Sequence, residues 1–126
     1  MIQKKVKIAG DDMEYLNKVL GVKVTYEDVE YLIPFKAKAW MDLTDRKASG
    51  EHVASKNIKK HKNDVFRLTD LIDPTVKIAA PQGVYADIQE FVQRMKNENV
   101  DTRQLGLVGR TKEKILEELK EIYETL

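Results

Sequence analysis

The stretch that decides the fold runs from Tyr31 to Leu71 and reads YLIPFKAKAWMDLTDRKASGEHVASKNIKKHKNDVFRLTDL. Apolar residues recur in it every three or four positions, which is the period of an α-helix. Pro is tolerated in the first turn of a helix, and Gly commonly follows the last turn. Pro34, Gly50 and Pro74 therefore predict two helices, residues 34–49 and 56–72, with Ser55 as the cap of the second.

Residues recur at helical spacing in both segments. In the first, the helical spacing runs through Phe35, Ala39, Asp42 or Leu43, and Arg46. In the second, an apolar line shares its face with His61 and consists of Ile58, Val65, Leu68 and Ile72.

Residues 1–33 are expected to form a strand-helix-strand lead-in. Lys4–Ala9 and Val22–Tyr26 alternate polar and apolar residues, as half-buried strands do, and Met13–Leu20 lies between them as a short helix. Asp11 and Asp12 follow Gly10 and are typical of a turn with a helix cap. A divalent-ion site at these two acids is the less favoured alternative.

The C-terminal part is expected to hold two more helices. Thr75–Ala80 reads as a short extended link, and Pro81 opens a helix that fades near residues 97–99. Residues 101–110 form a connector, and Thr111 caps a last helix. The inward residues of these helices are Val84, Ile88, Phe91, Val92 and Met95, then Ile115, Leu119, Ile122 and Leu126. Residues 1–126 thus predict one α+β domain, mainly helical, with short N-terminal strands and about four helices.

Composition excludes several classes of protein. The 126 residues are 42% hydrophobic and 34% charged, which suits one soluble domain with a single core. The absence of Cys excludes a disulfide scaffold, a thiolate zinc site and a cysteine nucleophile. No apolar run approaches the roughly 18 residues of a spanning helix, so no membrane association is expected. Without an apolar stretch after the N-terminal lysines, a signal peptide is not expected and the cytoplasm is the expected location.

The net charge of +1 conceals an uneven distribution. Residues 36–67 hold nine basic and four acidic residues, whereas the segments on either side are slightly acidic. An anionic partner would be attracted to this central third. Six of its basic residues are candidate nucleic-acid contacts: Arg46, Lys47, Lys56, Lys59, Lys60 and Lys62. The alternative is a lysine-rich helix face that is merely solvated.

Familiar catalytic signatures are missing, and the chemistry-bearing candidates lie in the same central stretch. There is no phosphate-binding glycine loop, zinc-protease motif or nucleophile elbow, and His52 and His61 do not have the spacing of a metal site. Lys36 and Lys38 stand among apolar residues, where an ammonium usually has an anionic partner unless it extends to solvent. Asp64 lies inside a helix without a capping role; its ordinary interpretation is a surface acid or a pair with Lys60.

These residues carry a resemblance to a known family. Leu32–Ala39 (LIPFKAKA) and His61–Leu68 (HKNDVFRL) are similar to two motifs in the C-terminal half of the abortive-infection (AbiE-type) toxin nucleotidyltransferases. That family comprises polymerase-β-like toxins of prokaryotic type IV toxin–antitoxin systems. The resemblance places Lys36 on the lysine of the Lys-x-x-Ala motif and Asp64 on the first acid of the motif [RK]-x-Asp-x-x-Asp-Leu. Arg67 stands where the family has the second acid, which is a departure.

The resemblance implies a two-lobed transferase. Lys36, with Lys38 beside it, is expected to contact the phosphates of a nucleoside triphosphate, and Asp64 to position catalytic groups. Mg²⁺ and a nucleoside triphosphate are expected for the complete enzyme, with neither held by this chain alone, and RNA and an antitoxin are the implied partners. The chain has no Gly-Ser motif followed by paired acids, so the metal-binding lobe is expected from a missing N-terminal part or a partner chain. Alternatives are a nucleic-acid-binding module and a protein-interaction domain without enzymatic activity.

Overall fold

A computed structural model describes residues 26–126 as four helices and two short strands. The elements are α2 (Tyr26–Ala48), α3 (Ser55–Asp70), β1 (Ile78–Ala80), α4 (Gln82–Met95), α5 (Lys112–Ile122) and β2 (Tyr123–Thr125). The mainly helical α+β prediction is confirmed. The predicted strand Lys4–Ala9 and helix Met13–Leu20 lie outside the described residues, and so does the predicted strand at 22–26 except for Tyr26, which begins α2.

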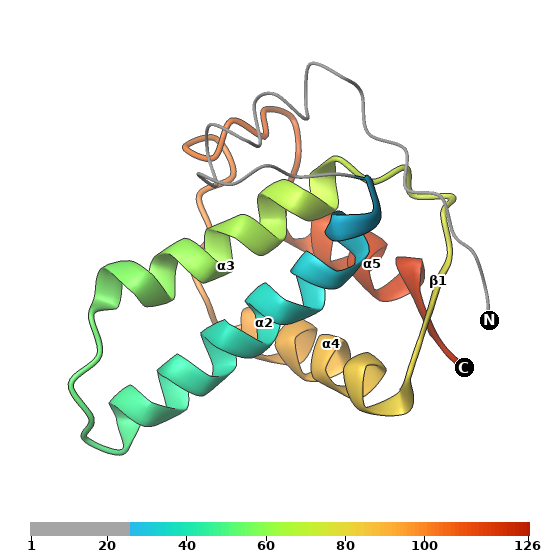
Figure 1. Cartoon of the computed structure of the whole chain (residues 1–126). Helices are drawn as coiled ribbons and strands as arrows, with labels where there is room; N and C mark the ends of the chain where they lie inside the picture. The colour runs from blue at the N-terminus through green and yellow to red at the C-terminus, as the bar shows by residue number, and fades with distance from the viewer. Residues whose placement is uncertain (1–25) are drawn as a thin grey trace.

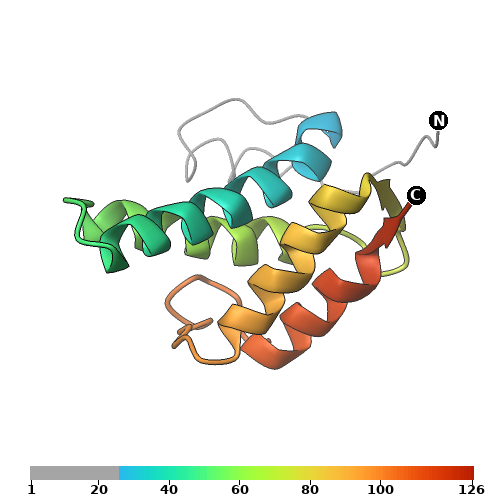
Figure 2. The same ribbon diagram turned by 90° about the horizontal axis from the view of Figure 1, so that it is seen from below.

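The helices form two crossed pairs. α2 and α3 run as an antiparallel hairpin, and the pair formed by α4 and α5 crosses it (Figures 1 and 2). The free end of the hairpin, where α2 ends and α3 begins, projects beyond α4 and α5 in both views. None of the described helices combines the length and the apolar character needed to cross a membrane.

Helix α2 starts eight residues before the predicted start at Pro34, which therefore lies inside the helix. A proline in a helix interior removes the N–H that would bond to the carbonyl four residues earlier. Here that carbonyl belongs to Glu30, and it accepts a hydrogen bond of 2.9 Å from the hydroxyl of Tyr123. A donor from the C-terminal end of the chain thus replaces the missing backbone donor, and this explains why the helix continues through Pro34.

Tyr123→Phe is expected to lower the free energy of unfolding by about 1–3 kcal/mol, because it leaves the Glu30 carbonyl without this donor. Tyr123 is buried, so water cannot readily take its place. Urea denaturation measures the change. Tyr31→Phe, at an exposed tyrosine of the same helix, is the control and is expected to change stability by less than about 0.5 kcal/mol.

The buried face of α2 does not contain Phe35, the first of the residues whose spacing predicts the helix. The helical period is correct, but Phe35 is 64% exposed, and the core side of the helix is formed by Val29, Ile33, Ala37, Trp40 and Met41. These five residues also follow a helical spacing and pack with Phe66, Phe91 and Leu119 in one core. The rings of Trp40 and Phe91 make a T-shaped contact with a centroid distance of 5.6 Å and an interplanar angle of 84°.

The ends of α3 and α5 also differ from the sequence analysis. Ala54, not Ser55, is the N-cap residue of α3, and no side chain caps that end. Thr111 caps α5 as predicted and accepts a 3.1 Å hydrogen bond from the backbone N–H of Lys114. However, α5 ends at Ile122, and Leu126 is 73% exposed and not inward.

The segment after α5 is a strand because it has a partner far away in sequence. β2 pairs in parallel with β1, in a register that puts Ile78 opposite Tyr123 and Ala80 opposite Thr125. β1 lies in the segment predicted as an extended link. This pairing places Tyr123 beneath α2, where its hydroxyl reaches Glu30.

Candidate functional site

A buried carboxylate lies between two cations where α2 and α3 pack together. Asp64 of α3 is fully buried, and its Oδ2 is 3.2 Å from Nζ of Lys36 on α2. Its Oδ1 is 3.7 Å from the guanidinium of Arg67, one turn later on α3. The two predicted residues Lys36 and Asp64, 28 positions apart in the sequence, are thus brought together by the hairpin.

The three side chains differ in their access to solvent. The Lys36 side chain is 13% exposed and that of Arg67 is 21% exposed, whereas Asp64 is inaccessible. Within the described part of the chain, both carboxylate oxygens lack a hydrogen bond of good geometry, although the cations lie within ion-pair distance. A buried carboxylate is costly without cationic partners, so Asp64 and the two cations hold one another in place. Of these three side chains, only Lys36 and Arg67 are accessible to a ligand.

His61 adds a neutral group to this cluster, which we call the Asp64 cluster: Lys36, His61, Asp64 and Arg67. His61 precedes Asp64 by one helical turn, and its Nδ1 is buried without a hydrogen-bond partner among residues 26–126. Burial lowers the pKa of His61, and repulsion by Lys36 and by Lys60 lowers it further against the attraction of Asp64. The imidazole is therefore neutral at pH 7, and the cluster has two positive charges and one negative charge.

The protein is expected to become less stable at acidic pH because of His61. The unfolded chain takes up the proton near the ordinary pKa of 6.5, and the folded chain does so only at lower pH. The free energy of unfolding should therefore drop as the pH falls below about 6.5. We expect urea denaturation at pH 7.5 and 5.5 to show a smaller drop for His61→Asn than for the original chain. His52→Asn, at an exposed histidine, should leave the drop unchanged; the opposite pattern would contradict this assignment.

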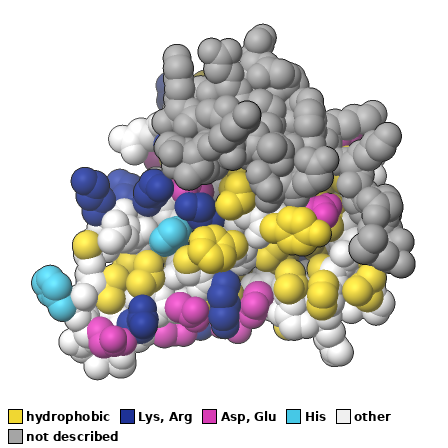
Figure 3. Space-filling model, in the orientation of Figure 1, with side chains coloured by type: hydrophobic (Ala, Val, Ile, Leu, Met, Phe, Trp, Pro, Cys, Tyr) yellow, Lys and Arg dark blue, Asp and Glu magenta, His cyan; other side chains and the backbone are white. Residues whose placement is uncertain are grey.

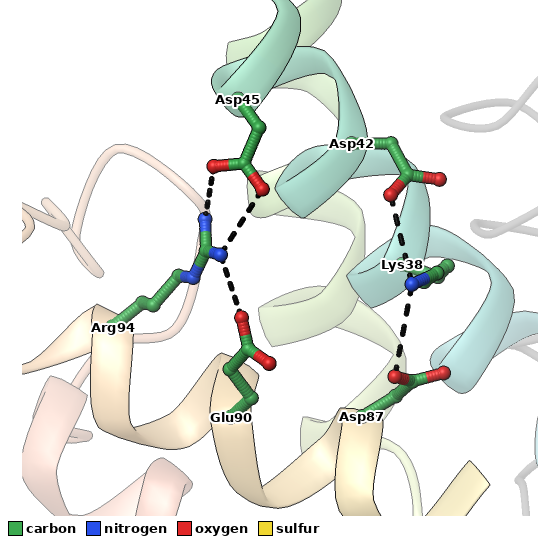
Figure 4. A network of polar contacts seen from close by, with 6 residues as sticks. All are labelled: Lys38, Asp42, Asp45, Asp87, Glu90 and Arg94. Atoms are coloured by element: carbon green, nitrogen blue, oxygen red, sulfur yellow. Dashed lines mark hydrogen bonds and ion pairs between the residues drawn. The ribbon is translucent and has the colours of Figure 1, made fainter. Parts of the chain in front are cut away.

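Lys38 lies in a separate network between α2 and α4. Figure 4 shows its ammonium between Asp42, one turn further along α2, and Asp87 of α4, at 3.6 and 3.8 Å. Beside it, Arg94 of α4 donates two hydrogen bonds to Asp45 and one to Glu90. The Arg94 guanidinium lowers the pKa of Asp45 below its usual value. Lys38 thus points to α4 and away from the Asp64 cluster.

The six predicted nucleic-acid contacts do not form one surface. Lys47, Lys59 and Lys62 line a groove between the two helices of the hairpin, and Lys62 is bound to Glu98 there at 3.2 Å. Lys56 and Lys60, one turn apart on α3, are exposed and not among the groove residues. Arg46 is exposed and pairs with Glu51 at 3.6 Å. Lys and Arg side chains gather over α3, whereas acidic and basic side chains alternate along α2 (Figure 3).

Two features of the site were missed in the sequence. Arg67 was noted only as a departure from a motif, yet its i,i+3 spacing from Asp64 is a known ion-pair spacing and could have identified it. The lowered pKa of His61 comes from its partial burial and from repulsion by Lys36 on the other helix, and no local pattern encodes that second contribution. Among residues 26–126, no group of three or more His, Asp or Glu side chains is placed to hold a metal ion.

Comparison of the chain with protein-family models, with curated proteins and with solved structures finds no match.

Proposed function

We propose that this chain is the C-terminal lobe of a polymerase-β-like nucleotidyltransferase and that Lys36 supplies a contact to the phosphates of a nucleoside triphosphate. The Gly-Ser motif and the paired metal-binding acids of such an enzyme would belong to another lobe. The observation that carries the proposal is the Asp64 cluster, in which one buried carboxylate holds two partly accessible cations. The resemblance of the two surrounding motifs to the AbiE-type transferases agrees with this role.

The charge balance of the cluster favours an anionic ligand. With His61 neutral, Lys36 and Arg67 exceed Asp64 by one positive charge, and both cations reach the surface. A phosphate group placed over Lys36 would receive hydrogen bonds from an ammonium whose position Asp64 already fixes. Such preorganised donors lose little entropy on binding and stabilise charge that develops on the transferred group.

Each residue has a separate part in this proposal. Lys36 binds and orients the phosphates, and Asp64 holds the Lys36 ammonium in place from the buried side. The cations of the Asp64 cluster suit the triphosphate but not its Mg²⁺. Asp64 is inaccessible, and the described residues include no cluster of acids that could bind the metal ion. When bound, Mg²⁺ would offset phosphate charge during transfer, and its ligands would come from the other lobe.

Full binding of the triphosphate needs the other lobe, but under this proposal the isolated chain keeps a weak contact to ATP at Lys36. Lys36→Ala is expected to weaken that contact at least tenfold, about 1.4 kcal/mol. The titration can follow the fluorescence of Trp40, which is the only tryptophan and lies one turn from Lys36. Lys120→Ala, at an exposed lysine on α5, is the control and should bind ATP like the original chain. Equal affinities in all three proteins would refute the phosphate contact at Lys36. Lys38→Ala tests whether the neighbouring lysine, held by two acids, contributes as well.

Catalysis gives a second test of the proposal. The chain alone should not incorporate labelled nucleotide into RNA in the presence of Mg²⁺. Incorporation without a partner would show that this chain carries its own metal-binding acids, and the lobe assignment would be wrong.

A nucleic-acid-binding module is the second candidate function, and one observation favours it. Lys56, Lys59 and Lys60 are exposed, and no acidic side chain of residues 26–126 forms an ion pair with them. Free lysines of this kind bind phosphates in a salt-dependent manner. If RNA binding falls steeply with salt and is unaffected by Lys36→Ala, this candidate is favoured over the nucleotide lobe.

A further inference from the structure

The free end of the α2–α3 hairpin contains a groove that the proposed nucleotide site does not use. The groove has a volume of about 490 Å³, within the range typical of ligand sites, and lies between α2 and the first half of α3. Its lining residues are Trp40, Thr44, Lys47, Ala48, Ser55, Ile58, Lys59, Lys62 and Glu98. Neither Lys36 nor Asp64 is among them, so the groove and the Asp64 cluster are separate sites.

The groove combines an apolar floor with a cationic rim. Ala48 and Ile58 provide accessible apolar surface, Trp40 is an almost fully buried lining residue, and Lys47 and Lys59 are exposed on opposite helices. Lys47 donates a hydrogen bond to the hydroxyl of Ser55, and no acidic residue of the described chain pairs with Lys47 or Lys59. The third lysine, Lys62, is already neutralised by Glu98.

A polar group without a partner also lies in this groove. The hydroxyl oxygen of Thr44 is buried and forms no hydrogen bond with residues 26–126. Buried hydroxyls are normally satisfied, so this one is an unmet hydrogen-bonding group in the wall of the groove.

We propose that this groove docks an acidic amphipathic helix of a protein partner. Its apolar side chains would cover Ala48 and Ile58, above the buried Trp40, and its acidic side chains would pair with Lys47 and Lys59. Ser55 and Lys62 are seven residues apart on α3, so the groove extends about 10 Å, which corresponds to two turns of a docked helix. Helices that bind in grooves commonly place apolar anchors at such spacing.

The floor of the groove argues against a nucleic acid as the occupant. Bases bind single-strand sites by stacking on exposed aromatic faces, but Trp40 is only 3% exposed. A docked helix does not have this requirement, because its apolar side chains need contact area at Ala48 and Ile58 and not an open ring face.

The test uses two labelled peptides of about 14 residues, roughly four helical turns. Both have leucines at helical spacing; one carries glutamates at the other positions and the second carries lysines. We expect the glutamate peptide to bind and to change the fluorescence of Trp40, the only tryptophan. The double variant Lys47→Glu and Lys59→Glu should bind the glutamate peptide at least tenfold more weakly and gain binding of the lysine peptide.

The matched control reverses the same amount of charge elsewhere. Lys114→Glu with Lys120→Glu changes two exposed lysines of α5 and should bind the glutamate peptide like the original chain. Ala48→Glu, at an exposed position of the groove, should weaken binding without altering any lysine. Circular dichroism of every variant shows whether it remains folded.

Several results would overturn the proposal. It is wrong if the original chain does not bind the glutamate peptide, if both charge-reversal variants lose binding equally, or if a single-stranded RNA competes for the groove. It is also wrong if sedimentation shows self-association that the Lys47 and Lys59 substitutions abolish, because the occupant would then be a second copy. Binding of ATP should be unaffected by these substitutions, so failure of this proposal is distinct from failure of the nucleotide site.

Discussion

Asp64→Ala should destabilise the protein by about 2–4 kcal/mol, because it leaves the cations of Lys36 and Arg67 packed together without the carboxylate that compensates them. Breaking a fully buried ion pair would lower the free energy of unfolding further. Here the side chains of Lys36 and Arg67 are 13% and 21% exposed, so both cations keep some solvation. Urea denaturation at pH 7.5 measures the loss. Asp42→Ala is the control, since its pair with Lys38 is more than half exposed on both sides and should contribute less than about 1 kcal/mol.

The double variant Lys36→Met with Asp64→Leu separates charge from packing. Replacing both members of a buried pair by apolar groups is often neutral, so it should be more stable than Asp64→Ala alone. If Asp64→Ala costs no more than Asp42→Ala, the carboxylate does not compensate the cations and the Asp64 cluster is wrongly described.

Phe66→Ala should cost about 3–5 kcal/mol, because the ring is fully buried in the core beside Asp64 and its removal leaves a large cavity. Phe35→Ala removes the same side chain from a position that is 64% exposed and should change stability by less than about 0.5 kcal/mol. Thermal or urea denaturation compares the two. A larger loss for Phe35 would mean that α2 buries the face that contains Phe35 and not the face observed.

The face of α2 illustrates what a helical period can and cannot decide. Both faces of this helix carry large apolar residues at the same spacing, Phe35 on one and Ile33 with Trp40 on the other. The period therefore identifies the helix, while the choice of face depends on which residues meet α3 and α4. The start of α2 was missed for a similar reason: the donor that permits Pro34 inside the helix comes from Tyr123.

The individual residues of the site could be predicted from the sequence, but their pairing could not. Lys36 was singled out as an ammonium in need of an anion, and Asp64 as an acid without a local role. The pair forms across the antiparallel hairpin, and a single sequence contains no signal for that register. The separation of the basic residues into groove and outer surface likewise follows from helix geometry, since residues three or four apart share a face and adjacent ones do not.

The most direct test of the central claim is a crystal structure of this chain with a nonhydrolysable ATP analogue. A phosphate oxygen within hydrogen-bond distance of Nζ of Lys36, with Asp64 still beneath that ammonium, is the predicted result. Triphosphate bound elsewhere, at the lysines of the groove for example, while Lys36 remains paired only with Asp64, would contradict it.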